Sequence, residues 1–529
     1  MIIISGIRIP LGAEVGEAES AALRMLGAAK GSVLEKHVRR VSFDARHGSI
    51  SQVCSVSVTL NDSEAEKRLS EANPSFSLAE KMVYEPIIGS QNLNSRPVVI
   101  GFGPAGIFAA YLLAKNGYRP IVLERGADME KRVRAVEGFF SGGEFSQISN
   151  VQFGEGGAGT FSDGKLTTRI NDPRCDFVLD TFVKFGAPEE ILIRQKPHIG
   201  TDRLRGIVSN IRTYIESCGG EIHFESCVDD IVCQNGRVTA LECGGERFEA
   251  EAAVLACGHS ARDTFTMLSD KPVILTAKPF SVGLRVEHLQ SDIDRALYGR
   301  FAGDARLPHG EYALSAKVGG RGVYTFCMCP GGSVVAASSE DGGIVTNGMS
   351  NSLRDKKNAN SAVAVSVDSR DFGYNPFKAI DMQRSIERSA YAAAGGGFTA
   401  PAQDMRSFLS GAAAALEIDR IEPTYQRKVA VYKLEKLFGN EIGAALKTGM
   451  TLFTRKIGCF TCGDAILTGP ETRTSSPLRI ERDEICREAV GVGGLYPCGE
   501  GAGYSGGIMS SAVDGLKTAE TIMEKYKPF

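Results

Sequence analysis

The sequence lacks a strong excess of charge of either sign. It carries 60 basic and 63 acidic residues, which gives a formal net charge of −3. Such a balance provides no general electrostatic attraction to nucleic acid or to anionic lipid. A local basic patch is still compatible with these numbers, so the overall charge excludes only a generally basic or acidic protein.

Long apolar runs are lacking as well. The N-terminal stretch MIIISGIRIPLG has only four apolar residues in succession and no basic segment before them. That is too short for a secretory signal or a membrane span, and no later run reaches the roughly 18 apolar residues that a span requires. The sequence therefore predicts a cytoplasmic protein without a membrane partner.

A disulfide framework is not indicated either. The 13 cysteines are odd in number and scattered over a long chain, unlike those of small secreted proteins. Two pairs stand closer together, Cys327 with Cys329 and Cys459 with Cys462. A zinc or cluster site would need the two distant pairs to converge, so no metal is predicted. A redox dithiol at Cys459 and Cys462 is left open.

At 529 residues the chain exceeds what one hydrophobic core usually serves, so two or three domains are expected. Residues 1–95 read as a strand, a helix and a hairpin that turns at His47 and Gly48, which suits a small ferredoxin-like α+β module. The polar stretch 89–97 ends in proline and reads as a linker. No internal repeat or low-complexity tract is found.

Residues 98–125 carry the strongest motif. A buried strand at 98–100 leads through G-x-G-x-x-G into a helix that ends at Gly117, and a second strand at 120–123 ends in an acid. Such glycines let the backbone approach a pyrophosphate, the helix N-terminus offers free N–H groups, and the acid accepts from a ribose hydroxyl. The residues assigned to a dinucleotide are Gly101, Gly103, Pro104, Ala105, Gly106, Glu124 and Arg125.

Two later segments bear on which dinucleotide is bound. A run of short strands that includes Val228 ends in a buried strand leading to Cys257 and Gly258. Near the C-terminus a short strand is followed by Gly499 and Glu500, then by Gly506, Gly507 and Ile508 at the start of an amphipathic helix. In these three segments the chain resembles flavoproteins of the glutathione-reductase-like class, although Cys257 stands where threonine is usual.

This resemblance implies FAD as the cofactor. It implies that Glu500 binds the ribityl or pyrophosphate hydroxyls, and that the N–H groups of Gly507 and Ile508 face the N1–C2=O edge of the flavin. A helix N-terminus at that edge stabilises the negative charge that develops when the flavin is reduced. The alternative for the two glycines is a simple helix entry.

A more particular resemblance covers nearly the whole chain. The segments GEGGAGTFSDGKLTTR, KPHIGTDRL, KPFSVGLRVEH, YTFCMCPGG, TNGMSNSLRD, LTGPETRTSSPLRIER and PCGEGAGYSGG are similar to those of a bacterial family of FAD-dependent dehydrogenases whose substrate is uncharacterised. This family implies a cofactor and a reaction class but no substrate. Since only one fingerprint is complete, NAD(P)H is expected at most as a transient electron donor.

Residues 154–169 nearly form a P-loop, with Gly159 followed at the P-loop spacing by Gly164 and Lys165. Leu166 occupies the position that needs a hydroxyl for Mg²⁺, and no clean apolar strand precedes the loop. Nucleotide hydrolysis is therefore not predicted. By resemblance, the glycine-rich loop runs beside the flavin, so that Gly156, Gly157 and Thr160 contact FAD and Lys165 lies near the flavin or its substrate.

Four further residues are candidates for catalysis. Arg473 and Arg479 lie in a polar, basic string before the third flavin segment and are expected to bind an anionic substrate or to stabilise reduced flavin. The alternative is a solvated loop. His198 and His288 are candidate proton donors because histidine titrates near neutral pH, although a lone histidine is more often structural.

The sequence thus predicts an α/β protein with a Rossmann-type FAD-binding domain, formed by residues 96–275 and 485–529. Residues 276–484 are an inserted mixed α+β substrate domain. The predicted function is hydride transfer between flavin N5 and a small, anionic substrate. Two alternatives stay open: a flavoprotein that acts on RNA through its N-terminal module, and a flavin redox sensor without enzymatic activity.

Overall fold

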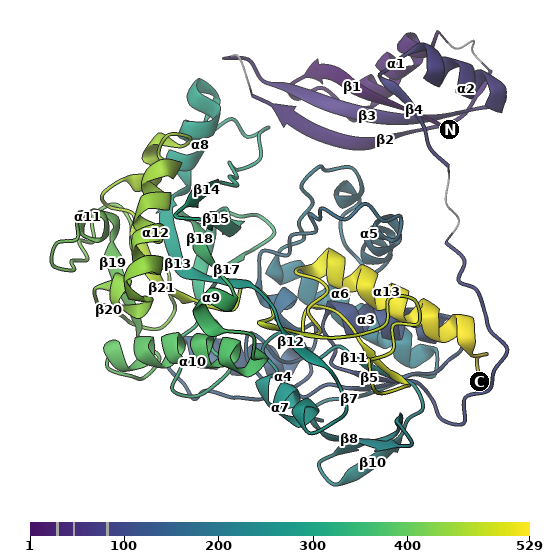
Figure 1. Ribbon diagram of the computed structural model, residues 1–529. Helices are drawn as coiled ribbons and strands as arrows, with labels where there is room; N and C mark the ends of the chain where they lie inside the picture. Colours follow the sequence, from purple (N-terminus) through teal and green to yellow (C-terminus); the bar gives the residue numbers. More distant parts are fainter. Residues whose placement is uncertain (28–30, 46–47, 81–83) are drawn as a thin grey trace.

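The computed structural model describes residues 1–27, 31–45, 48–80 and 84–529, and it has a mixed α/β fold (Figure 1). His47, one of the two residues of the expected hairpin turn, lies outside the described residues. Three larger sheets organise the described chain, and each has its own buried core. No helix among the described ranges is both long and apolar enough to cross a membrane.

The N-terminal sheet has its strands in the order β2-β3-β1-β4 and its elements along the chain in the order β-α-β-β-α-β, which also occurs in ferredoxin-like modules. Helix α1 ends at Gly27 in the left-handed conformation, and the Asp62 carboxylate caps α2. The elements are β1 (Ile2–Pro10), α1 (Val15–Leu26), β2 (Val33–Asp44), β3 (Ser51–Leu60), α2 (Ser63–Ala72) and β4 (Phe76–Leu78).

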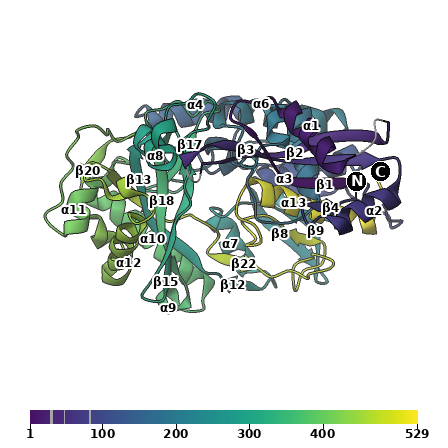
Figure 2. The ribbon, with the colours of Figure 1, turned by 90° about the horizontal axis from the view of Figure 1, so that it is seen from above.

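The N-terminal sheet lies above α3, α5 and α13 in Figure 1 and overlies α3 and α13 when seen from above (Figure 2). The Val41 N–H donates to the Ile193 carbonyl at 2.6 Å, and Arg39 pairs with Asp176 at 2.9 Å. The stretch expected as a linker is held as well, because the Gly89 N–H donates to the Met523 carbonyl at 2.7 Å. It therefore packs along the C-terminal helix.

A parallel sheet with the order β23-β11-β5-β6-β7 lies at the centre. In β5, Val99 faces the helices, whereas Val98 and Ile100 face an antiparallel three-stranded sheet, as strand alternation requires. The central strands are β5 (Val98–Ile100), β6 (Ile121–Leu123), β7 (Glu221–His223), β11 (Ala253–Leu255) and β23 (Leu495–Pro497). The antiparallel strands are β8 (Val228–Gln234), β9 (Arg237–Cys243) and β10 (Glu246–Glu249).

Helix α3 is buried around most of its circumference because α13, α6 and the central sheet enclose it. The closest approach is between α3 and α13, where Gly515 meets the Ala105 backbone: a Cβ added to Gly515 would lie 2.1 Å from the Ala105 carbonyl oxygen. The helices of this part are α3 (Pro104–Lys115), α4 (Met129–Phe140), α5 (Arg174–Lys184), α6 (Thr201–Ser217), α7 (Arg262–Ser269) and α13 (Ile508–Lys525).

The third sheet has the order β14-β15-β18-β13-β21-β19-β20 and is antiparallel except for its last pair. Helices α10 and α12 pack on it. Its strands are β13 (Phe280–Leu289), β14 (Ser315–Val318), β15 (Arg321–Cys329), β18 (Asn358–Val367), β19 (Ala400–Asp404), β20 (Val429–Val431) and β21 (Ile466–Glu471). Its helices are α8 (Gln290–Tyr298), α9 (Ser369–Phe372), α10 (Pro376–Ala393), α11 (Met405–Ser410) and α12 (Gly439–Phe453).

The chain passes between the central sheet and the seven-stranded sheet through two adjacent strands. Strand β12 (Leu275–Ala277) pairs antiparallel with β22 (Leu478–Ile480), so the entry and the exit lie side by side. A further pair, β16 (Gly332–Ala336) with β17 (Thr346–Ser350), flanks the sheet and contributes Asn347 to the cavity described next.

Candidate functional site

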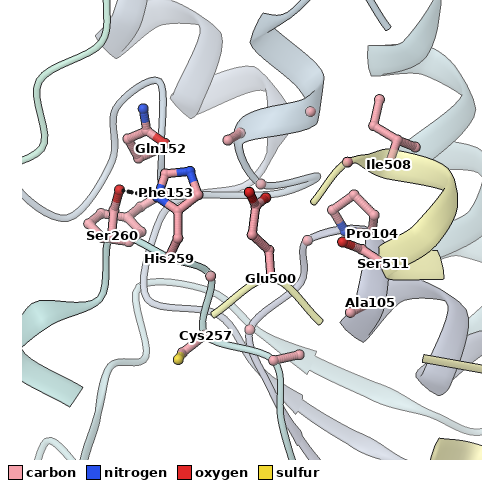
Figure 3. Close-up of a pocket in the computed structure, with 18 of the residues that line it drawn as sticks. Pro104, Ala105, Gln152, Phe153, Cys257, His259, Ser260, Glu500, Ile508 and Ser511 are labelled. Atoms are coloured by element: carbon pink, nitrogen blue, oxygen red, sulfur yellow. Dashed lines mark hydrogen bonds between the residues drawn. The ribbon is translucent and has the colours of Figure 1, made fainter. Parts of the chain in front are cut away.

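A cavity of about 340 Å³ opens at the carboxyl ends of β5 and β11, between the N-termini of α3 and α13 (Figure 3). Its volume is within the range of small-molecule and cofactor sites. Many residues proposed from sequence line it, although they come from distant segments: Gly101, Gly103, Pro104, Ala105, Glu124, Arg125, Gly157, Lys165, Val228, Cys257, Gly258, Arg473, Glu500, Gly506, Gly507 and Ile508.

The first glycines of the fingerprint form a turn with no room for side chains. Gly101 has φ +94°, and a Cβ there would lie 2.5 Å from the Ala256 carbonyl oxygen. Gly106 does not line the cavity; it lies one turn into α3, where a Cβ would be 1.9 Å from the Gly101 carbonyl oxygen. Because a helix leaves its first N–H groups without intrahelical partners, Ala105 presents a free donor at the cavity.

Glu124 ties this turn to the glycine-rich loop. Its carboxylate accepts from the N–H groups of Phe102 at 2.7 Å and of Gly126 and Gly154 at 2.9 Å. The side chain is buried, yet it also lines the cavity. Neighbouring Arg125 pairs with Asp263 at 3.0 Å and is therefore anchored beside the cavity wall.

The glycine-rich loop is held from behind by Arg132 of α4, which is fully buried. Its guanidinium donates to five backbone carbonyls between residues 150 and 157. Gly157 has φ +61°, and a Cβ there would lie 2.9 Å from the Gly103 Cα. The loop and the fingerprint turn therefore meet backbone to backbone, and neither tolerates a side chain at this point.

Two residues assigned to FAD in this loop lie behind the wall. Gly156 and Thr160 do not line the cavity; a Cβ on Gly156 would lie 2.0 Å from the Thr160 hydroxyl oxygen, and the Thr160 carbonyl accepts from the Thr201 hydroxyl at 2.5 Å. The short 3₁₀ helix η2 (Ala158–Phe161) turns the chain here and aims Thr160 inward. Neither residue lines this cavity, so their contact with FAD stays a prediction; in the structure they shape the loop.

The third segment forms the opposite wall. Gly507, with φ +151°, caps α13, so the N–H of Ile508 has no intrahelical partner. Gly499 does not line the cavity, because its N–H is turned away and donates to the Asp514 carboxylate at 2.7 Å. Asp514 in turn pairs with Arg482 and Arg487, and this buried cluster holds the turn before α13 in place.

Glu500 extends into the cavity from this turn (Figure 3). No hydrogen-bond or ion-pair partner of its carboxyl group is found within the described part of the chain. Burial raises the pKa of Glu500 to about 7, an effect that Lys278 partly opposes. An unpartnered, half-buried carboxyl facing a cavity is suited to accept or donate a hydrogen bond to a bound ligand.

We expect the FAD-free protein to show the titration of Glu500 in its stability. The pKa of Glu500 in the folded state is higher than its ordinary value of 4.5, so protonation of Glu500 stabilises the folded state. This stabilisation is complete below about pH 4.5 and is lost as pH rises through about 7. Glu500→Gln should therefore unfold at a higher temperature than the wild type at about pH 8 and equally at about pH 4.5.

The matched control is Glu488→Gln, because Glu488 is paired with Lys525 at 3.1 Å and its pKa is lowered, mainly by that lysine against burial. Glu488→Gln should therefore unfold at a lower temperature than the wild type at about pH 8, whereas Glu500→Gln should unfold at a higher one. If both variants moved in the same direction, Glu500 would not titrate as described.

His259 is a cavity residue that the sequence did not single out (Figure 3). It follows Gly258 directly, and its Nδ1 lies 3.0 Å from the Ser260 hydroxyl. Burial, then the charges of Arg473 and Arg262, lower the pKa of His259 to about 3, so the imidazole is neutral at neutral pH. In the sequence, His259 could have been found from its position directly after the middle FAD segment. Only the fold, however, places two guanidiniums beside it.

Arg473 lines the cavity but is not a free cation. Its guanidinium pairs with Glu387 of α10 at 2.9 Å and donates to the Ser339 hydroxyl. Arg262 of α7 pairs with the same carboxylate at 2.9 Å. All three charged groups are buried, and Glu387 is shared by both guanidiniums, while Arg262 also pairs with Glu340 at 2.8 Å.

Three other catalytic candidates do not line the cavity. Arg479, in β22, lies over the Tyr504 ring at 4.9 Å. The Nε2 of His198 lies 3.1 Å from the Ser352 carbonyl oxygen. His288 is fully buried in β13 with its Nε2 2.8 Å from the Phe460 carbonyl oxygen. None of the three is among the residues that line the cavity, so their catalytic roles stay predictions, and His198 is joined to the cavity-lining Lys165 by a backbone bridge.

Lys165 differs from these because it lines the cavity. Its Nζ donates to the Met328 carbonyl and lies 3.7 Å from Glu311. We expect Lys165→Ala to weaken FAD retention about tenfold, since a hydrogen bond from a charged group contributes about 1.5–3 kcal/mol. Retention is measured as flavin absorbance remaining after ultrafiltration.

Lys196→Ala is the control for this change. Lys196 approaches the same Glu311 at 3.8 Å but is exposed and does not line the cavity. It should retain FAD as the wild type does. Equal retention by both variants would assign Lys165 to the surface.

The cavity has the features that a dinucleotide requires. Two helix N-termini present free N–H groups to one space, and the backbone approaches it at glycines where a Cβ would collide. Glu124 and Glu500 supply hydrogen-bond acceptors at separate places in the wall. These residues would hold the pyrophosphate and the hydroxyls of FAD.

Comparison with known proteins agrees with this geometry. Residues 279–474, which include the strands from β13 to β21, match the family model described as FAD-dependent protein, C-terminal domain-like. The chain is also 44% identical over 529 residues to a protein of Clostridium beijerinckii described as "Uncharacterized protein", and the match covers 99% of this chain and 98% of that protein.

Solved structures resemble the chain only distantly. L-proline dehydrogenase from P. horikoshii has 11% sequence identity and a TM-score of 0.33, with 82% of this chain and 94% of that chain covered. L-amino acid deaminase from Proteus vulgaris has 9% identity and a TM-score of 0.35, with 84% and 93% covered. At such scores the likeness carries no argument. The matched family and the full-length relative place this chain in a family of FAD-dependent proteins.

Proposed function

We propose that the protein is an FAD-dependent oxidoreductase that transfers hydride between flavin N5 and a small substrate. The observation that carries the proposal is the cavity between the N-termini of α3 and α13. It combines a dinucleotide cradle, which consists of the glycine turns and these two helix N-termini, with side chains from the seven-stranded sheet. The cradle alone would serve any FAD protein. Side chains from the seven-stranded sheet line the same cavity, where they could contact a second molecule beside the cofactor.

FAD, when bound, would supply the hydride acceptor or donor of this reaction. The N–H groups at the start of α13 would stabilise negative charge on the flavin edge. His259 is neutral and can donate one hydrogen bond and accept another at the cavity wall. Glu500, with a pKa of about 7, can hold or release a proton near neutral pH.

We also propose that the FAD segments follow the glutathione-reductase-like arrangement, with residues 276–484 as the substrate-covering domain. In support, the parallel central sheet receives the fingerprint, the middle segment and the C-terminal segment on neighbouring strands β5, β11 and β23. The seven strands of the third sheet all come from the proposed insertion.

For the substrate we propose a small anion. In its support, Lys165 and Arg473 both line the cavity, although Lys165 lies 3.7 Å from Glu311 and Arg473 pairs with Glu387. We propose NAD(P)H only as a transient electron donor, since one dinucleotide fingerprint is present in the sequence. A basic RNA-binding surface on the N-terminal sheet has little support, because Lys36 pairs with Glu19 and Arg39 with Asp176.

The test is anaerobic reduction of the full-length, FAD-loaded protein, followed by its flavin spectrum. A panel of small carboxylates, amino acids and hydroxy acids is compared with uncharged analogues, and NADH and NADPH are tested separately. We expect bleaching by at least one anionic compound and not by its uncharged analogue. If dithionite bleaches the flavin and no organic compound does, the oxidoreductase proposal fails and a redox sensor takes its place.

A further inference from the structure

Strand β15 contains a bulge where it passes the cavity. Its pairing with β18 shifts between Phe326 and Cys329, and Cys327 within the bulge has φ +44°. Few residues with a side chain adopt this conformation, and such outliers concentrate at functional sites. Cys327 lines the cavity. Bulges beside active sites commonly re-aim one side chain, and here the side chain is a thiol.

Two cations hold the bulge in place. Arg285 of β13 is fully buried and donates from Nη1 to the Cys327 carbonyl at 2.8 Å. The same guanidinium makes a bidentate pair with Glu471 at 2.6 and 2.7 Å. Lys165 donates to the next carbonyl, that of Met328. The unusual backbone is therefore fixed by buried charged contacts and is not a loose surface feature.

The second thiol of the pair lies directly behind the first. Cys329 is buried, and its Sγ donates to the Cys327 carbonyl at 3.3 Å. The hydrogen bond between the two thiols, then Arg285 and Lys165, lower the pKa of Cys327 against the effect of burial. The pKa of Cys329 is raised by the same hydrogen bond and by burial. Of the two thiols, Cys327 is therefore the one that ionises more readily.

The other close cysteine pair lacks these features. Neither Cys459 nor Cys462 lines the cavity. Burial raises the pKa of Cys459 to about 11 and also raises that of Cys462. The Cys459 thiol donates to the Asp292 carbonyl at 3.6 Å. The redox role that the sequence left open for this pair therefore has no support from its surroundings.

We propose that Cys327 and Cys329 form a redox-active dithiol that exchanges electrons with the FAD of the neighbouring cavity. This rests on the proposed function, because it requires FAD to bind there. The Cys327 thiolate and the Cys329 thiol are oxidised to a disulfide, an S–S bond forms, and the S–H bond of Cys329 breaks. Both electrons and the proton pass to FAD, giving its reduced anion FADH⁻. The reverse step reduces the disulfide with reduced flavin.

The experiment is a reductive titration of the full-length, FAD-loaded protein, equilibrated in air and then made anaerobic. Dithionite is added until the flavin is fully bleached. The wild type is expected to take up twice as many electrons per FAD as Cys327→Ser or Cys329→Ser, since a disulfide and a flavin each accept one electron pair. The control Cys459→Ser should match the wild type.

A second measurement does not depend on the variants folding. Samples of the wild type taken before and after dithionite treatment are denatured and alkylated, and the masses of the cysteine-containing peptides are measured by mass spectrometry. Cys327 and Cys329 are expected to be joined before reduction and alkylated only afterwards, whereas Cys459 and Cys462 are alkylated in both samples. Equal electron uptake by the wild type and Cys327→Ser, or alkylation of both thiols before reduction, overturns the proposal.

The two proposals fail separately. If the wild type and Cys327→Ser take up equal numbers of electrons but an organic substrate still bleaches the flavin, the oxidoreductase proposal stands and the dithiol is rejected. If the peptides show the disulfide and no substrate bleaches the flavin, the dithiol stands without the proposed hydride transfer.

Discussion

Glu387→Gln is expected to destabilise the protein by about 3–5 kcal/mol, the loss typical of removing one partner from a buried ion pair. Glu387 is fully buried and pairs with Arg262 and Arg473, both at 2.9 Å. The neutral amide would remove the carboxylate that pairs with Arg473 and would leave Arg262 with Glu340 alone. Denaturant unfolding monitored by circular dichroism measures the free energy of unfolding.

The pH dependence gives this prediction a second readout. Burial opposes ionisation, but Arg262 and Arg473 outweigh it and hold the pKa of Glu387 well below its usual range. A lowered folded pKa contributes stability above the ordinary pKa near 4.5, and that stability is lost as pH falls. The wild type should therefore lose stability in acid more steeply than Glu387→Gln.

Glu340→Gln is the matched control. Glu340 also pairs with Arg262, at 2.8 Å, and with Arg384, but its side chain is 26% exposed. Water can replace its contribution, so we expect a loss of at most about 1 kcal/mol. Equal losses for the two variants would mean that Glu387 is not the group that neutralises the buried guanidiniums.

Gly106→Ala is expected to decrease FAD retention about tenfold or more and to cost about 1–3 kcal/mol of stability. The new Cβ would lie 1.9 Å from the Gly101 carbonyl oxygen, so α3 must move away from the turn that carries the cavity N–H groups. Flavin absorbance after ultrafiltration and the free energy of unfolding are measured on the same preparation.

Gly138→Ala controls for the general effect of replacing a helical glycine. Gly138 lies in α4, is exposed, and has no atom within 4 Å of an added Cβ. This change should stabilise the protein by about 0.5–1 kcal/mol and leave FAD bound. If Gly106→Ala retained FAD equally well, the close approach of α3 to the turn would not matter for the cofactor.

Local motifs could be predicted where neighbours in sequence are neighbours in space. The strand at Val98–Ile100, the helix from Pro104 and the glycines between them all lie where the pattern placed them. The same holds for Gly507 before α13. Each depends on backbone geometry within a few residues, which residue type and spacing largely determine.

Side chains were harder to place than backbone turns. Arg479, His198 and His288 looked equally suited to chemistry, yet each contacts a ring or a carbonyl and none is among the cavity-lining residues. Thr160 and Gly156 belong to the right loop but face its far side. Which way a side chain points depends on partners that are distant in the sequence, and no local pattern encodes them.

By itself, then, the sequence determined the FAD cradle and the order of its three segments, because glycine spacing and helix starts are local properties. Only the tertiary structure decided the chemistry around it. Burial, together with Arg473 and Arg262, lowers the pKa of His259, and Arg285 donates to the carbonyl of Cys327 in the bulge. Charge and proton affinity depend on which groups are buried together, and folding alone brings β13, β15 and α10 beside the cradle.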